Sequence, residues 1–167
     1  MKKIVFITLS LFFAISFWNC EKDDICAEGT PVTPRLIIEF YDAANPTVLK
    51  NVTNLDVIES TFTEGFGFTG VSKIQVPLRT TDDFTSLNFI QNGSDTNTTN
   101  DNIDAITINY NRVDEYISRA CGFKTLFFLN DTNAIVLTPD SNNWIQNIII
   151  SQPNIENENE VHVKIYF

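Results

Sequence analysis

The sequence is poor in basic residues, in histidine and in cysteine, and each shortage excludes a class of function. Only 11 Lys and Arg residues stand against 21 Asp and Glu residues, and after Lys2-Lys3 the basic ones occur singly. Such a surface repels nucleic acid, so we expect no nucleic-acid partner. Three cysteines and one histidine that is distant in the sequence do not make a metal site. We therefore expect neither a metal nor another cofactor.

Helical periodicity is missing too, because no window of adequate length carries an apolar stripe at helical spacing. Apolar and polar residues alternate instead, as at residues 35–41, 73–79, 105–111 and 161–167. This period of two is typical of strands with one buried face. Further expected strands lie at residues 54–60, 85–91, 115–120, 123–130, 133–138 and 144–151. We predict an all-β fold, an antiparallel β-sandwich of about eight or nine strands, built by residues 35–167 as a single domain.

One apolar run stands out at residues 4–18, between two lysines and Cys20. It is shorter than the roughly 20 apolar residues that a membrane-spanning helix needs. The pattern is typical of a bacterial lipoprotein signal peptide, so we predict that residues 1–19 are removed and that Cys20 is lipidated. Residues 20–34 then form an acidic tether. An uncleaved N-terminal anchor, or secretion with Cys20 left as a thiol, are the alternatives.

The residues after Cys20 indicate an address. Lys22-Asp23-Asp24 is similar to the signal that sends Bacteroidota lipoproteins to the outer face of the outer membrane. We therefore expect a lipid-anchored protein at the cell surface, with the periplasmic face as the alternative. A charged tether that simply stays solvated also explains these residues.

Four segments, residues 20–30, 34–42, 118–124 and 154–160, carry a resemblance to a known family. They resemble a domain-of-unknown-function family, family 6452, of flavobacterial and other Bacteroidota lipoproteins. The resemblance runs over the whole mature chain. It implies a location and a fold class, and it offers no catalytic residue.

The cysteine count fits an exported protein. With Cys20 lipidated, Cys26 and Cys121 remain, and an even pair in an oxidising compartment predicts a disulfide. It would close a loop of about 95 residues, worth about 4.5 kcal/mol in the chain-entropy model. We expect the bridge to tie the tether to the core, and two separately buried thiols are the alternative.

A glycine-rich segment is the candidate contact site for a partner. Residues 65–70 spell G-x-G-x-x-G, but a strand pattern follows where a dinucleotide site needs a helix. We expect a hairpin tip or bulge that holds Phe66 and Phe68 near the surface. Exposed aromatic residues are typical interface anchors, so these two are predicted to contact an envelope protein such as an outer-membrane barrel.

Other polar motifs give no catalytic site. Residues 95–102 alternate oxygen-bearing side chains but lack the glycine and glutamate of a calcium loop, so we expect a mobile polar loop. The carboxylate pairs at 82–83 and 114–115 point to opposite faces of a strand and cannot flank one glycosidic bond. His162 lies between two valines and should face outward, far in sequence from any nucleophile. We expect no enzyme.

Trp144 is the last candidate, and it leads to the alternative function. A tryptophan on a sandwich face stacks on sugar rings, whereas one at the start of an apolar strand is usually core. We expect a lipid-anchored outer-membrane lipoprotein that is a non-enzymatic accessory or scaffold module of an envelope complex. The alternative is a glycan- or small-ligand-binding surface lipoprotein linked to nutrient capture.

Overall fold

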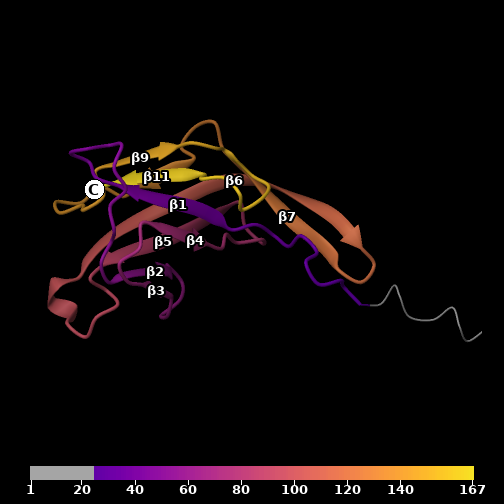
Figure 1. Cartoon of the computed structure of the whole chain (residues 1–167), viewed down its shortest axis with the longest axis horizontal. Coiled ribbons are helices and arrows are strands. Elements are labelled where there is room, and N and C mark those ends of the chain that lie inside the picture. The colour runs from indigo at the N-terminus through magenta and orange to yellow at the C-terminus, as the bar shows by residue number, and fades with distance from the viewer. Residues whose placement is uncertain (1–24) are drawn as a thin grey trace, which may run out of the picture. The chain divides into compact units, whose positions relative to one another are not determined.

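The computed structural model describes residues 25–167 (Figure 1). The predicted signal peptide, the lipidation site Cys20 and the address signal Lys22-Asp23-Asp24 lie outside these residues. The chain forms two compact units. One, the sandwich unit, consists of Val32–Asp114 and Thr125–Phe167. The other, here called the hairpin unit, is described at residues 25–31 and Glu115–Lys124.

Almost all regular structure in the described residues is β-strand. The strands are β1 Leu36–Tyr41, β2 Leu55–Glu59, β3 Phe66–Phe68, β4 Lys73–Val76, β5 Phe84–Gln91, β6 Asn102–Ser118, β7 Gly122–Leu129, β8 Ile135–Leu137, β9 Asn147–Ile150, β10 Asn154–Ile155 and β11 Val163–Tyr166. A single 3-10 turn, η1 Thr98–Asn100, precedes β6. No helix within residues 25–167 has the length and apolar character needed to cross a membrane.

The strands form two sheets, which confirms the predicted all-β sandwich class. The smaller sheet has the order β4-β1-β11-β9 (Figure 1). The larger sheet has the order β10-β7-β6-β5-β2-β3, with β8 paired to β6. The expected segments 105–111 and 115–120 both fall largely on the single strand β6, and β8 lies within the expected segment 133–138. The strand count still exceeds the expected eight or nine, because the sequence did not indicate β3 and β10, which are only three and two residues long. Such segments are too short to show alternation. One pair, β1 with β11, is parallel.

The two sheets of the sandwich unit share one buried core. In the smaller sheet, the side chains of Leu36, Ile38 and Phe40 are at most 2% exposed. Leu87 and Phe89 of the larger sheet belong to the same core cluster. These residues sit at alternate positions, so the period of two that predicts the strands also fills the core. Each fully buried side chain of this size contributes about 1.5–3 kcal/mol.

A buried carboxylate fixes the segment that leads into β9. Asp104 is fully buried on β6 and accepts hydrogen bonds from the backbone N–H groups of Trp144 (3.3 Å) and Ile145 (2.8 Å). The indole N–H of Trp144 donates to the carbonyl of Phe89 at 3.2 Å. Trp144 is 7% exposed, so it belongs to the core, and the suggestion that its ring stacks on a sugar is corrected.

His162 is also inside the protein, so the prediction that it faces outward is wrong. It is 1% exposed, and its Nδ1 accepts a hydrogen bond of 3.0 Å from the backbone N–H of Ile37. Strict alternation fails at this point because β11 starts only at Val163, and both residues are buried. A residue just before a strand need not follow the pleat of that strand.

Candidate functional site

The candidate site lies on the sandwich unit, where the edge strands β3 and β4 follow each other along the chain. β3 stands at one end of the larger sheet and pairs with β2, through Leu55↔Phe68 and Val57↔Phe66. β4 stands at one end of the smaller sheet and pairs with β1. Among the described residues each strand therefore has one side without a strand partner. Such edges offer backbone N–H and C=O groups to another chain.

The glycines of the G-x-G-x-x-G segment place β3 at this edge. A Cβ on Gly65 would collide with the carbonyl oxygen of Val57, so only glycine allows the close approach of the two strands. Gly70 has φ +65°, which turns the chain away after β3. Phe66 and Phe68 thus lie in a short edge strand, and the expectation that they form a hairpin tip is corrected.

Two hollows flank Phe66. The first has a volume of about 320 Å³, and its lining includes Phe66, Pro77 and charged residues of both signs. The second has a volume of about 520 Å³ and is also lined by Phe66 and Pro77. The first is completed by Glu59, Phe62, Glu64, Gly65, Leu78, Arg79 and Thr85, and the second by Arg35, Phe68, Lys73, Ile74 and Gln75. Phe66 therefore stands at the boundary of two neighbouring recesses.

The aromatic residues of the site differ in their exposure. Phe66 is 51% exposed and Phe62 is 66% exposed. Phe68 is partly buried and packs against the core cluster, although it also lines the second hollow. Of the two residues predicted to contact a partner, Phe66 is the one that presents a ring to the surface.

An arginine dominates the electrostatics of the first hollow. Arg79 pairs with Glu59 at 3.2 Å and with Asp82 at 2.9 Å. Hydrogen bonds from Thr61 lower the pKa of the Glu59 carboxyl, and Arg79 lowers it further. Glu59 is therefore an anion at neutral pH, bound to its own neighbours and not a proton donor.

The backbone of Arg79 is fixed by two buried hydroxyl groups. Its N–H donates to the Thr85 hydroxyl at 2.9 Å, and its carbonyl accepts from the Tyr110 hydroxyl at 2.9 Å. The two hydroxyl oxygens lie 2.6 Å apart. Burial raises the pKa of the Tyr110 hydroxyl, which keeps it neutral and able to donate. This part of the first hollow is therefore rigid and already formed.

The second hollow is lined by two basic residues, Arg35 and Lys73. Arg35 makes two hydrogen bonds of 2.7 Å from its guanidinium to Glu158, and its backbone N–H adds a third of 3.0 Å. The pKa of Arg35 is raised and that of Glu158 is lowered, chiefly through these side-chain hydrogen bonds. Lys73 lies 3.5 Å from Glu39. The lining itself contains both cations and no acidic residue, in a chain where acidic residues prevail.

The other polar motifs do not converge on this site. Asp82 binds Arg79, whereas Asp83 binds Arg112 at 2.9 Å, so the two neighbouring carboxylates serve different partners. Residues 95–102 contain the turn η1, in which Asn97 caps the backbone of Thr99, so the expected mobile loop has local order. Within residues 25–167 no group of three or more His, Cys, Asp and Glu side chains could hold a metal ion.

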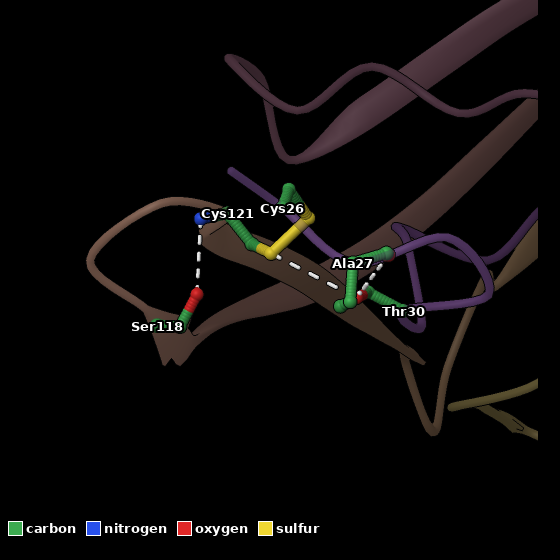
Figure 2. Close-up of a disulfide and its surroundings, with 5 residues drawn as sticks. All are labelled: Cys26, Ala27, Thr30, Ser118 and Cys121. Atoms are coloured by element: carbon green, nitrogen blue, oxygen red, sulfur yellow. Dashed lines mark hydrogen bonds between the residues drawn. A yellow bond between two sulfur atoms is a disulfide. The ribbon is translucent and has the colours of Figure 1, made fainter. Parts of the chain in front are cut away.

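The disulfide between Cys26 and Cys121 is confirmed (Figure 2). The backbone N–H of Cys121 donates to the Ser118 hydroxyl at 3.0 Å, and the Thr30 hydroxyl donates to the carbonyl of Ala27 at 2.6 Å. Both cysteines belong to the hairpin unit and not to the core cluster. The bridge therefore joins the N-terminal segment to the turn between β6 and β7, which corrects the expectation that it reaches the core.

Sequence reasoning missed several residues that line the hollows. Phe62 had a readable signal, since it is an aromatic residue within the polar segment 60–65 and has no strand pattern around it. Arg79 closes the alternating segment 73–79 at an outward position. The sequence did not indicate Arg35 as a site residue, because its partner Glu158 is 123 residues away in the sequence.

Comparison with known proteins gives a family. No curated protein and no solved structure matches the chain. The family model DUF6452, described as a family of unknown function, matches residues 53–167. This match contains both edge strands and Cys121, whereas the N-terminal segments of the resemblance, residues 20–30 and 34–42, lie before it. Since the match covers more than half of the sequence, the chain belongs to the DUF6452 family.

Proposed function

We propose that this chain is a lipid-anchored lipoprotein of the bacterial outer membrane, displayed at the cell surface, and that it acts there as a non-enzymatic accessory or scaffold module. The lipoprotein pattern that ends at Cys20 and the address signal that follows it support the location. The disulfide between Cys26 and Cys121 is consistent with it, because bridges of this kind persist in oxidising compartments.

One observation carries the proposed scaffold role. Phe66 is 51% exposed on an edge strand and separates two hollows. A large exposed aromatic residue beside preformed recesses is typical of an interface anchor, which contributes about 2 kcal/mol or more when it is buried by a partner.

The geometry favours a partner with an extended segment. Such a segment gains backbone hydrogen bonds from the free side of β3 or β4, and its side chains enter the hollows at alternate positions. Arg35 and Lys73 line the second hollow, so an acidic side chain of the partner is favoured there. The partner class that we propose is another envelope protein, such as an outer-membrane barrel.

The test is co-purification from detergent-solubilised membranes of the native host, with the full chain as bait. Phe66→Ala should reduce the recovery of the envelope partner without lowering the thermal midpoint. Phe84→Ala is the matched control, because Phe84 is 48% exposed and lines neither hollow. Equal partner recovery with both variants would contradict the proposal.

Phe68 needs a separate variant, because it packs against the core. Phe68→Ala should lower the free energy of unfolding by about 1–3 kcal/mol, less than a fully buried phenylalanine costs. If Phe68→Ala reduces partner recovery and Phe66→Ala does not, the reduction is due to the destabilised fold and not to a lost contact.

Binding of a glycan or a small ligand is the alternative function, and the hollow volumes support it. Recesses of about 300–1,000 Å³ are typical of small-molecule sites, and the two hollows have volumes of about 320 and 520 Å³. The buried Trp144 offers no stacking face, so a sugar would have to stack on Phe66 or Phe62. Calorimetric titration of wild type and Phe66→Ala with host glycans distinguishes this function from the scaffold role.

A further inference from the structure

The hairpin unit has an aromatic surface of its own. Tyr116 is 58% exposed and Phe123 is 66% exposed, and their rings meet edge to face with centroids 5.3 Å apart. We call these two residues the hairpin aromatic pair. Ile25, at 79% exposed, is another large apolar side chain that this unit leaves open to solvent. Exposed apolar groups gathered in so small a unit indicate a surface that something else covers.

The charge of the hairpin unit differs from that of the whole chain. Its described residues include two acidic side chains, Glu28 and Glu115, and two basic ones, Arg119 and Lys124. They are therefore formally neutral, whereas the full chain has a net charge of −10. Glu115 and Lys124 also pair with each other at 3.0 Å. A neutral aromatic surface can approach anionic lipid headgroups, which repel the acidic rest of the chain.

The position of the hairpin unit along the chain also indicates that a lipid membrane covers this surface. Cys26 follows Cys20 by six positions, a segment that spans at most about 20 Å when fully extended. Cys26 is bonded to Cys121, which lies two positions before Phe123 (Figure 2). A lipid on Cys20 would therefore hold the hairpin aromatic pair within reach of the membrane surface.

We infer that the hairpin aromatic pair inserts into the lipid–water interface of the membrane that carries the anchor. This inference rests on the proposed lipidation of Cys20. Tyrosine and other aromatic side chains favour that interface, because their rings are apolar and the tyrosine hydroxyl still reaches water. The contact adds a second attachment point, so it would fix the orientation of the hairpin unit relative to the bilayer.

The experiment uses the full lipid-anchored protein in phosphatidylcholine vesicles whose acyl chains carry bromine, which quenches nearby tryptophan fluorescence. Trp144 is the only tryptophan after the signal peptide, and its burial makes it a constant background. Phe123→Trp should lose at least twice as much fluorescence as wild type. Phe84→Trp is the matched control, since Phe84 is an exposed phenylalanine of the sandwich unit that lines neither hollow, and it should match wild type.

Vesicle flotation separates the two levels of the proposal. If the protein floats with the vesicles but Phe123→Trp and Phe84→Trp are quenched equally, the inference is overturned and the anchor stands. If the wild-type protein does not float, the anchor and the inference both fall. Should Phe123→Trp lower the thermal midpoint, Tyr116→Trp takes its place in the same measurement, with the same result expected.

Discussion

Lowering the pH should destabilise this protein through one residue, His162. The imidazole is 1% exposed, and its Nδ1 accepts the backbone N–H of Ile37 at 3.0 Å. Nδ1 can accept this bond only while it carries no proton. Protonation therefore removes a buried hydrogen bond and leaves both partners unsatisfied, which costs about 1–3 kcal/mol.

The direction of the pH effect follows from the shifted pKa. Burial lowers the pKa of His162 from its ordinary 6.5, and the charges of Glu160 and Glu158 oppose the shift only in part. The unfolded chain therefore takes up a proton below pH 6.5 while the folded protein does not. The free energy of unfolding should fall as the pH decreases below 6.5, by at most about 1.4 kcal/mol per pH unit, until the lowered pKa is reached.

Urea unfolding between pH 8 and pH 5 measures this slope, and His162 is the only histidine that can cause it. His162→Asn is the control, because an asparagine oxygen can accept the Ile37 N–H in place of Nδ1 and does not titrate. The pKa of Glu158 is itself lowered, so its titration falls below this range. A wild-type protein without the slope, or an asparagine variant that keeps it, would refute the reasoning.

Four further predictions concern the disulfide, the buried carboxylate of Asp104, the lipidation site and the address signal at residues 22–24. Cys26→Ser or Cys121→Ser should lower the free energy of unfolding by about 2–5 kcal/mol in urea, and two freely alkylated thiols in the native wild type would contradict the bridge. Asp104→Asn should cost about 1–3 kcal/mol in the same assay, since an amide offers one acceptor oxygen to two buried N–H groups. Cys20→Ser should abolish lipid labelling and either release the protein from membranes or leave an uncut precursor, and a mature wild type with an unmodified Cys20 thiol would reject the anchor. Alanine at residues 22–24 should reduce protease access on intact cells and leave membrane association unchanged.

The fold class was predictable because the strands obey a simple pattern. Leu36, Ile38 and Phe40 sit at alternate positions and are all buried, although Ile37 between the first two is buried as well. The two-residue strand β10 was not predictable, since alternation needs more positions to be recognised. The parallel pairing of β1 with β11 had no local signal either, because it joins the two ends of the sandwich unit.

Alternation also contained information about buried polar residues. Asp104 occupies the same side of β6 as Ile106 and Ile108, so the period of two places this carboxylate in the core. Thr85 precedes Leu87 in the same way on β5. A polar residue in register with a buried apolar series indicates an internal hydrogen bond, whereas reading only the apolar residues leaves it unnoticed.

The candidate site depended on contacts that no pattern along the chain encodes. The glycine segment predicted that Phe66 is exposed, and that part holds. The hollows on either side of Phe66 exist because β3 ends one sheet, β4 ends the other, and Pro77 lines both recesses. Sheet order is a property of the whole fold, so a site between two sheet edges is absent from any local window. The residues that identify such a site are single aromatic and basic side chains in polar segments, of which Phe62 is the example in this chain.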